Sequence, residues 1–212
     1  MQIKNILTQG VFLEDRYIPD YGELQEVLKT LRALGMQISM TQGVYDLLHP
    51  GHTRYLNKAK SFGDILVVAL DSDEYTKMRK ARENERRPLV PFDERLELLE
   101  NLRAVDIVTV RDLKEHKDDP YCIIKVVRPD VLVMSKSTKD VTEKDYEALR
   151  EFCGRVEVLE QQSTVSTTKR LRELLMDGAG GLVDHITDAI EQYFLQAGRE
   201  VNFKKKGGNG NG

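Results

Sequence analysis

Two histidines, His49 and His52, lie three residues apart in the stretch TQGVYDLLHPGHTRYL, where an apolar run gives way to a helical pattern. At this spacing the two imidazoles share one face of a helical turn and can point at the same oxygen atoms. The first turn of a helix binds phosphate through its N–H groups and its positive dipole end. Pro50 suits that turn, and Gly51 lets the backbone approach a ligand closely. We therefore interpret the pair as a phosphate-binding site.

Two other interpretations of the histidine pair stay open, a zinc site and a purely structural pair. Zinc needs a third and a fourth ligand, but His116 and His185 are isolated in the sequence. Cys122 and Cys153 are not at metal-ligand spacing and fit two reduced, buried thiols. We predict no metal ligand in the chain. In a structural pair, one ring would cap the helix and the other would pack.

Hydroxyl and basic side chains form a second group of candidates. The segment STTKRLRELLMDG begins a helical pattern, so its first hydroxyls and N–H groups could hold phosphates or simply cap the helix. The basic run KMRKARENERR contains Arg79 and Lys80, which could bind an anion or form a solvated face. The hydroxyl residues are Ser166, Thr167 and Thr168.

Alternating strands and helices must position these groups. Short apolar segments predict strands at 36–43, 65–71, 106–110, 131–134 and 155–160. Helical patterns fall at 21–35, 51–63, 91–105, 120–128, 142–153 and 166–178. ILVVALD is continuously apolar, as in a strand buried on both faces. The pattern predicts an α/β fold, a Rossmann-like doubly wound parallel sheet of five strands. In such a sheet ligands bind at the carboxyl ends of the strands, where His49 and His52 should lie.

The sequence also predicts segments outside this central domain. We expect a helical N-terminal extension at 1–35, the central α/β domain at 36–178, a C-terminal helix at 179–200 and a disordered tail at 201–212. The tail is basic and then rich in Gly and Asn, so it cannot bury apolar area. The two extensions would lie outside the core, forming a dimer interface or covering the site.

Composition limits the class of protein. Apolar residues make up 40% and charged residues 32% of 212 residues, which fits a soluble globular chain. The net charge of −3 argues against a dedicated nucleic-acid binder. The longest apolar runs are far shorter than the roughly 20 residues of a membrane span, and no basic-then-apolar leader opens the chain. We expect a cytoplasmic protein that binds neither nucleic acid nor membrane.

At these residues the chain resembles a known family. H-x-G-H after GVYD is similar to the signature of the nucleotidyltransferase superfamily, in its cytidylyltransferase-like branch. VSTTKR resembles the family's second signature and follows the fifth predicted strand, as expected. GDILVVALDSDEYTKMRK and RRPLVPFDER resemble the segments that bring basic residues to the site. The resemblance covers roughly residues 36–176 and is closest to heptose 1-phosphate adenylyltransferases, followed by glycerol-3-phosphate cytidylyltransferase and archaeal-type flavin adenylyltransferase.

The resemblance implies an enzyme that transfers a nucleoside monophosphate, AMP in preference, from a nucleoside triphosphate to a sugar phosphate and releases pyrophosphate. It implies Mg²⁺, which accompanies the triphosphate, a small phosphorylated acceptor and a homodimer. It assigns catalysis to His49, His52 and Lys80. It assigns the nucleotide to Gly43, Val44, Tyr45, Gly51, Arg95, Ser166, Thr167 and Thr168. It assigns the acceptor to Asp46 and Asp71, with Asp73 following the same strand.

Some residues depart from these families. Gln161 and Leu171 stand where relatives carry arginines, and MSKSTKD replaces a Gly- and Asp-rich turn, where Lys136 and Lys139 could bind anions instead. These departures leave two alternatives open. One is cytidylyl transfer to glycerol phosphate or a similar alcohol phosphate. The other is a non-catalytic nucleotide-binding module that kept the fold.

Overall fold

The structure is a computed structural model that describes residues 16–80, 87–136 and 148–162, together with residues 185, 186, 188, 189 and 192. The chain divides into two compact units, Met1–Thr167 and Thr168–Gly212. The described residues of the second unit are helical and fall within the predicted C-terminal helix. The predicted domain boundaries at residues 35 and 178 stay predictions.

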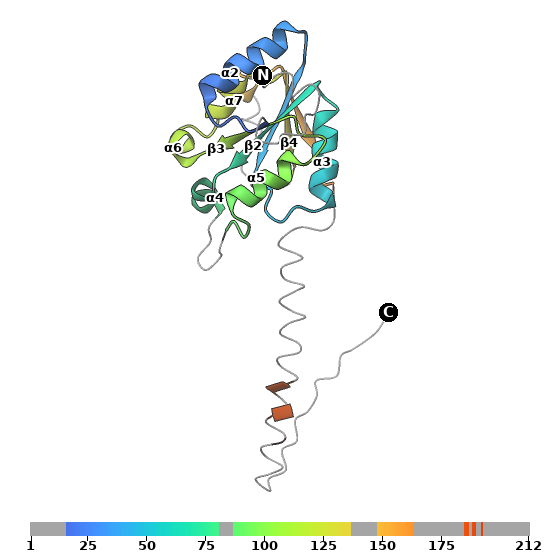
Figure 1. The fold of residues 1–212 in the computed structure, drawn as a ribbon, viewed down its shortest axis with the longest axis vertical. Helices are drawn as coiled ribbons and strands as arrows, with labels where there is room; N and C mark the ends of the chain where they lie inside the picture. Colours follow the sequence, from blue (N-terminus) through green and yellow to red (C-terminus); the bar gives the residue numbers. More distant parts are fainter. Residues whose placement is uncertain are drawn as a thin grey trace. The chain divides into compact units, whose positions relative to one another are not determined.

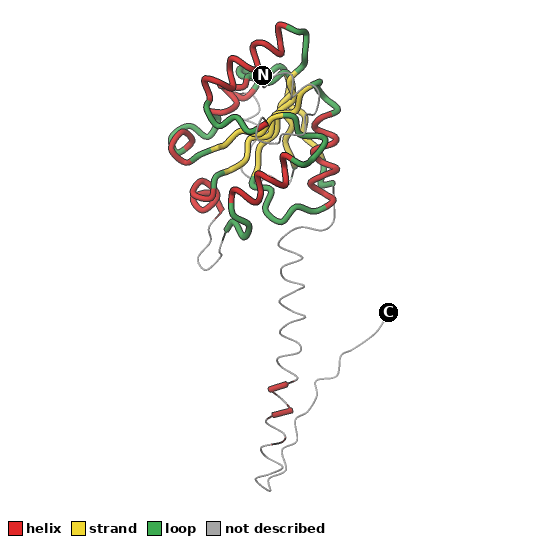
Figure 2. The backbone as a smooth tube through the Cα atoms, in the orientation of Figure 1, coloured by secondary structure: helices red, strands yellow, loops and turns green. Residues whose placement is uncertain are grey.

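The first unit is built on a five-stranded parallel sheet (Figures 1 and 2). The strands are β1 Ile38–Gly43, β2 Ile65–Asp71, β3 Ile107–Arg111, β4 Val131–Ser135 and β5 Arg155–Leu159. Their order is β3-β2-β1-β4-β5, and every pair is parallel. Every residue of β2, which lies between β3 and β1, is buried, as its continuous apolar run predicts. The predicted Rossmann-like α/β fold is confirmed.

Helices cover both faces of this sheet (Figure 1). They are α2 Tyr21–Ala33, α3 Pro50–Lys60, α4 Asp73–Lys80, α5 Phe92–Glu100, α6 Leu113–His116 and α7 Cys122–Val127. Apolar residues of α2 and α7 pack with Met40 and Val67 on one face. Those of α3 and α5 pack with Val68 and Leu70 on the other. The alternation of side chains along β2 therefore feeds two separate cores.

The helix α2 belongs to the first of these cores. Leu24, Leu28 and Leu31 are fully buried in the same cluster as Ile38 of β1. Ile18, just before α2, is also buried, and its N–H donates to the carbonyl of Val108 in β3 at 2.9 Å. The expectation that the N-terminal extension lies outside the core is therefore wrong for residues 18–31. The stripe of leucines that predicted the helix is the face of α2 that packs into the core.

Some predicted elements fall partly or wholly outside the described residues. Of the predicted helix 142–153, only residues 148–153 are described, and residues 148 and 149 are helical. The predicted helix at 166–178 and the tail lie outside the described part. Among the residues that are described, no helix is long and apolar enough to cross a membrane.

Truncating the buried face of α2 should destabilise the domain. We expect Leu28→Ala to lower the free energy of unfolding by about 2–5 kcal/mol, because it removes a fully buried side chain and leaves a cavity. The neighbouring Lys29 is exposed, so Lys29→Ala should change it by about 0.5 kcal/mol or less. Urea unfolding of the two variants measures the difference. Equal, small effects would mean that α2 is not part of the cooperative core.

Candidate functional site

The structure brings the two histidine rings together at the start of α3. Their centroids lie 4.0 Å apart, with 35° between the ring planes. His49 is the N-cap of α3, and its Nδ1 accepts the backbone N–H of Gly51 at 3.1 Å. An accepting nitrogen carries no proton, so the hydrogen of this neutral ring is on Nε2. The cap therefore fixes one tautomer and orients the ring.

The loop between β1 and α3 carries unusual backbone conformations. Tyr45 and Leu47 have φ angles of 52° and 46°, in a region that non-glycine residues seldom occupy and that costs about 1–3 kcal/mol each. Such conformations persist only where surrounding contacts impose them. The ring of Tyr45 meets that of His52 edge-on, with centroids 5.7 Å apart and 64° between the planes. Burial raises the pKa of Tyr45 well above its ordinary value.

Gly43 is the last residue of β1 and lies against Tyr45. A Cβ atom on Gly43 would approach Cε2 of the Tyr45 ring to 3.3 Å, which is tighter than ordinary contact. The hydroxyl of Tyr55 on α3 contacts the Thr41 hydroxyl at 2.8 Å and donates to the Val133 carbonyl at 3.0 Å. Burial raises the pKa of Tyr55 to about 12. These contacts tie the middle of α3 to β1 and β4.

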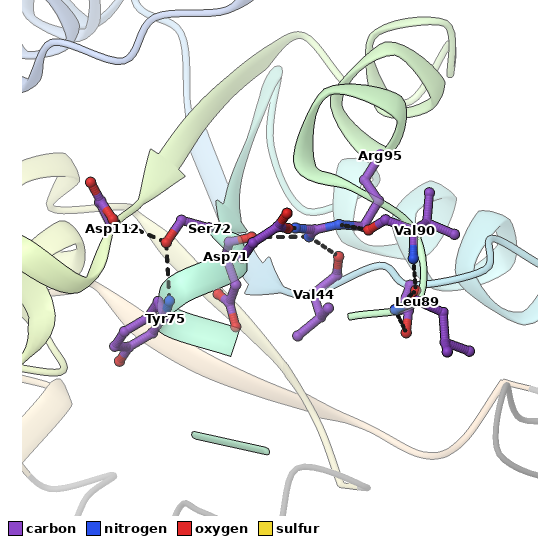
Figure 3. Close-up of polar contacts among 10 residues, drawn as sticks. Val44, Asp71, Ser72, Tyr75, Leu89, Val90, Arg95 and Asp112 are labelled. Carbon is purple, nitrogen blue, oxygen red and sulfur yellow. Dashed lines mark hydrogen bonds and ion pairs between the residues drawn. The ribbon is translucent and has the colours of Figure 1, made fainter. Parts of the chain in front are cut away.

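Arg95 is fully buried, and its guanidinium points toward Val44, Asp71 and Val90 (Figure 3). Its Nε donates to the Val90 carbonyl at 2.9 Å. One terminal nitrogen donates to the carbonyls of Val44 and Asp71, at 2.6 and 2.9 Å. The other pairs with the Asp73 carboxylate at 2.6 Å. Four of its five N–H groups therefore bind protein acceptors, so Arg95 joins these segments. Its predicted contact with a nucleotide stays a prediction.

Asp46 holds the segment before α5. Its carboxylate accepts the backbone N–H groups of Leu89 and Val90, at 3.0 to 3.1 Å, and pairs with Arg87 at 3.2 Å. The side chain is buried. This carboxylate therefore joins two loops. Its predicted contact with the acceptor or with Mg²⁺ stays a prediction.

Asp71, at the end of β2, is the centre of a buried ion cluster. Its carboxylate accepts from Arg111 of β3 at 2.7 Å and from Arg79 of α4 at 3.0 Å. Both guanidinium groups also lie over the ring of Tyr75, at 4.8 and 5.4 Å from its centroid. Asp71 is 0% exposed and holds two arginines at the carboxyl edge of the sheet. Its predicted contact with the acceptor stays a prediction.

Arg111 was missed from the sequence because the predicted strand ended one residue before it. The signal that could have found it is an ionisable residue directly after a buried strand. Asp71 and Arg111 are register partners at the ends of neighbouring parallel strands, so their side chains meet.

Several predicted site residues cannot be placed. Ser166, Thr167, Thr168 and Lys139 lie outside the described residues, as does the side chain of Lys80 at the end of α4. Lys136, at the end of β4, is exposed and pairs with Glu160 at 2.7 Å; this contact raises its pKa. Among the described residues, no group of three His, Cys, Asp or Glu side chains could hold a metal ion.

A cavity near the carboxyl edge of the sheet offers a different environment from the histidine pair. It measures about 240 Å³ and is lined by Ser72, Asp73, Glu74, Phe92, Val110 and Asp112. Its acidic lining would repel phosphate groups. The helix N-terminus at His49 and Gly51 offers the opposite electrostatics, so the histidine pair is the better candidate for binding phosphate.

The sequence matches the family model described as Cytidylyltransferase-like over residues 40–193. The chain belongs to this family. The bifunctional protein HldE of a Nitratiruptor species is 35% identical over 158 residues, covering 74% of this chain and 32% of that protein. HldE of Geobacter metallireducens is also 35% identical, over 163 residues, covering 76% and 31%. The chain thus spans about a third of the length of these relatives. Family and relatives together indicate a nucleotidyltransferase enzyme, as predicted.

Solved structures agree on the fold. Pantothenate synthetase from Thermus thermophilus superposes with a TM-score of 0.50 at 12% identity, covering 68% of this chain and 61% of that chain. At this identity the similarity concerns the fold alone.

Replacing Arg95 should destabilise the site. We expect Arg95→Lys to lower the free energy of unfolding by about 3 kcal/mol, because a lysine cannot reach four acceptors in a fork and leaves buried carbonyls unpaired. Arg103 is exposed, so Arg103→Lys is the matched control, with an expected change of about 0.5 kcal/mol or less. Urea unfolding of both variants measures the two changes in the free energy of unfolding. An Arg95→Lys protein as stable as the control would show that the fork is dispensable.

Proposed function

We propose that this chain transfers AMP from ATP to a sugar phosphate and releases pyrophosphate. The observation that carries the proposal is the stacked pair His49 and His52 at the N-terminus of α3. In the strand order β3-β2-β1-β4-β5, this helix start follows β1, next to β4, where the order reverses. Open α/β sheets bind ligands at such a reversal, beyond the carboxyl ends of the strands. The family supports the reaction class, and the motif similarity to sugar-phosphate adenylyltransferases supports AMP.

The proposed reaction needs positioning more than proton transfer. A phosphate oxygen of the acceptor attacks the α-phosphorus of the nucleotide; the new P–O bond forms as the bond to pyrophosphate breaks. The attacking oxygen is already anionic, so no general base is required. His49 and His52 would donate hydrogen bonds to the phosphate oxygens as negative charge shifts toward the leaving group. The positive dipole end of α3, at Gly51, adds a field that favours negative charge.

The remaining predicted contacts complete this proposal. The backbone at Gly43 and Val44 would line the nucleotide, and Lys80 would reach its phosphates. Ser166, Thr167 and Thr168 would hold the β- and γ-phosphates. Mg²⁺ would arrive with the triphosphate and neutralise part of its charge; it would be held mainly by phosphate oxygens, because the buried carboxylates of Asp46 and Asp71 are committed to protein donors. A homodimer remains part of the proposal.

Removing either histidine should abolish most of the activity. We expect His49→Ala and His52→Ala each to lower pyrophosphate release by about a hundredfold or more, because each loses a preorganised donor. The assay pairs ATP or CTP, with Mg²⁺, with a panel of sugar 1-phosphates and glycerol 3-phosphate. His185→Ala is the matched control, since His185 is exposed in the second compact unit; it should keep full activity.

The same assay separates the alternatives. Release with ATP and one sugar phosphate supports the proposal. Release only with CTP and glycerol 3-phosphate would replace it with cytidylyl transfer to an alcohol phosphate. Binding of ATP without release from any pair would favour a nucleotide-binding module. Undiminished release by both histidine variants would contradict the role given to the pair.

A further inference from the structure

The backbone of Tyr45 is held in its strained conformation from both sides. Before it, the Val44 carbonyl accepts from Arg95 at 2.6 Å. After it, the Asp46 carboxylate binds the N–H groups of Leu89 and Val90. Arg95 also donates to the Val90 carbonyl. The segment Leu89–Val90 therefore contacts both Arg95 and Asp46, the two side chains that hold the residues on either side of Tyr45. With both neighbours fixed, Tyr45 keeps a left-handed φ of 52° that an unconstrained tyrosine would leave.

This conformation directs the Tyr45 ring onto His52. The two rings meet edge-on at 5.7 Å, and the ring of His49 lies 4.0 Å from His52. His52 is therefore in contact with two rings, one fixed by its helix cap and one fixed by a strained backbone. Tyr45 itself is 6% exposed, so a ligand would meet little of it directly. Its influence would pass through His52.

We infer that Tyr45 is a positioning residue for His52, and that the strained loop holds this histidine at the angle the reaction needs. The inference rests on the proposed function. A donor acts on the transition state only if its direction is already fixed, because reorienting it during the reaction costs free energy. Small displacements of such groups lower rates on the order of a hundredfold. The aromatic edge supplies the positioning, so the hydroxyl of Tyr45 should matter less than its ring.

Two substitutions separate the ring from the hydroxyl. We expect Tyr45→Leu to lower kcat on the order of tenfold to a hundredfold, with little change in KM for the nucleotide. Tyr45→Phe keeps the ring and should stay within about threefold of the wild-type kcat. Tyr121→Leu, which removes a half-buried tyrosine from the opposite core, controls for a general loss of packing and should leave kcat unchanged. Equal losses in the Leu and Phe variants, or a wild-type kcat in Tyr45→Leu, would overturn the inference.

A spectroscopic measurement tests the same inference without turnover. NMR relaxation of the His52 ring carbon should show greater mobility in Tyr45→Leu than in Tyr45→Phe or the wild type. Gly43→Ala presses on the Tyr45 ring from β1 without replacing either ring, so it should shift the His52 ring resonances. Unchanged His52 signals in both Tyr45→Leu and Gly43→Ala would overturn the inference. If the wild type released no pyrophosphate, the proposed function would fail, and the NMR result would still decide whether Tyr45 positions His52.

Discussion

The guanidinium of Arg95 is the contact on which the site depends. Burying a full positive charge is costly unless it is paired and hydrogen-bonded. Here the carboxylate of Asp73 supplies the opposite charge, and the remaining hydrogen-bond acceptors are the carbonyls of Val44, Asp71 and Val90. These acceptors come from the ends of β1 and β2, the start of α4 and the segment before α5. One planar fork thereby fixes the relative positions of three segments at the carboxyl edge of the sheet, which are the loop after β1, the β2–α4 connection and the segment before α5 (Figure 3).

The rest of the edge is arranged around that fixed point. Asp46 pairs with an arginine of the segment before α5, and Asp71 pairs with arginines of α4 and β3. These carboxylates therefore connect neighbouring segments of the chain. The rigidity this provides offsets the cost of the left-handed backbone at Tyr45 and Leu47. The contacts of Arg95 and Asp46 thus hold a strained loop in place. The loop leads into α3, where His49 and His52 lie side by side. This is the general way in which a protein prepares hydrogen-bond donors before a charged ligand arrives.

The fold and the histidine pair could be predicted from the sequence because both depend on local patterns. The segment ILVVALD is almost entirely apolar, which predicts a strand buried on both faces. The i, i+3 spacing of His49 and His52 places the two rings on one helical face. The roles of Arg95, Asp46 and Asp71 could not be predicted in this way. A charged residue near a motif looks the same in sequence whether it faces a ligand or a buried carbonyl. Only the contact between β1, β2 and the segment 87–90, far apart in the chain, decides between them. The burial of α2 was visible as a leucine stripe, but its partner surface was not.

The most direct test of the account is a titration of the protein with Mg·ATP, followed by the ring nitrogen resonances of its histidines. If the pair at the start of α3 binds the triphosphate, the signals of His49 and His52 shift saturably and together, while the signal of the exposed His185 stays in place. Binding of ATP that leaves the resonances of His49 and His52 unchanged would contradict the account, because the nucleotide would then occupy another part of the molecule.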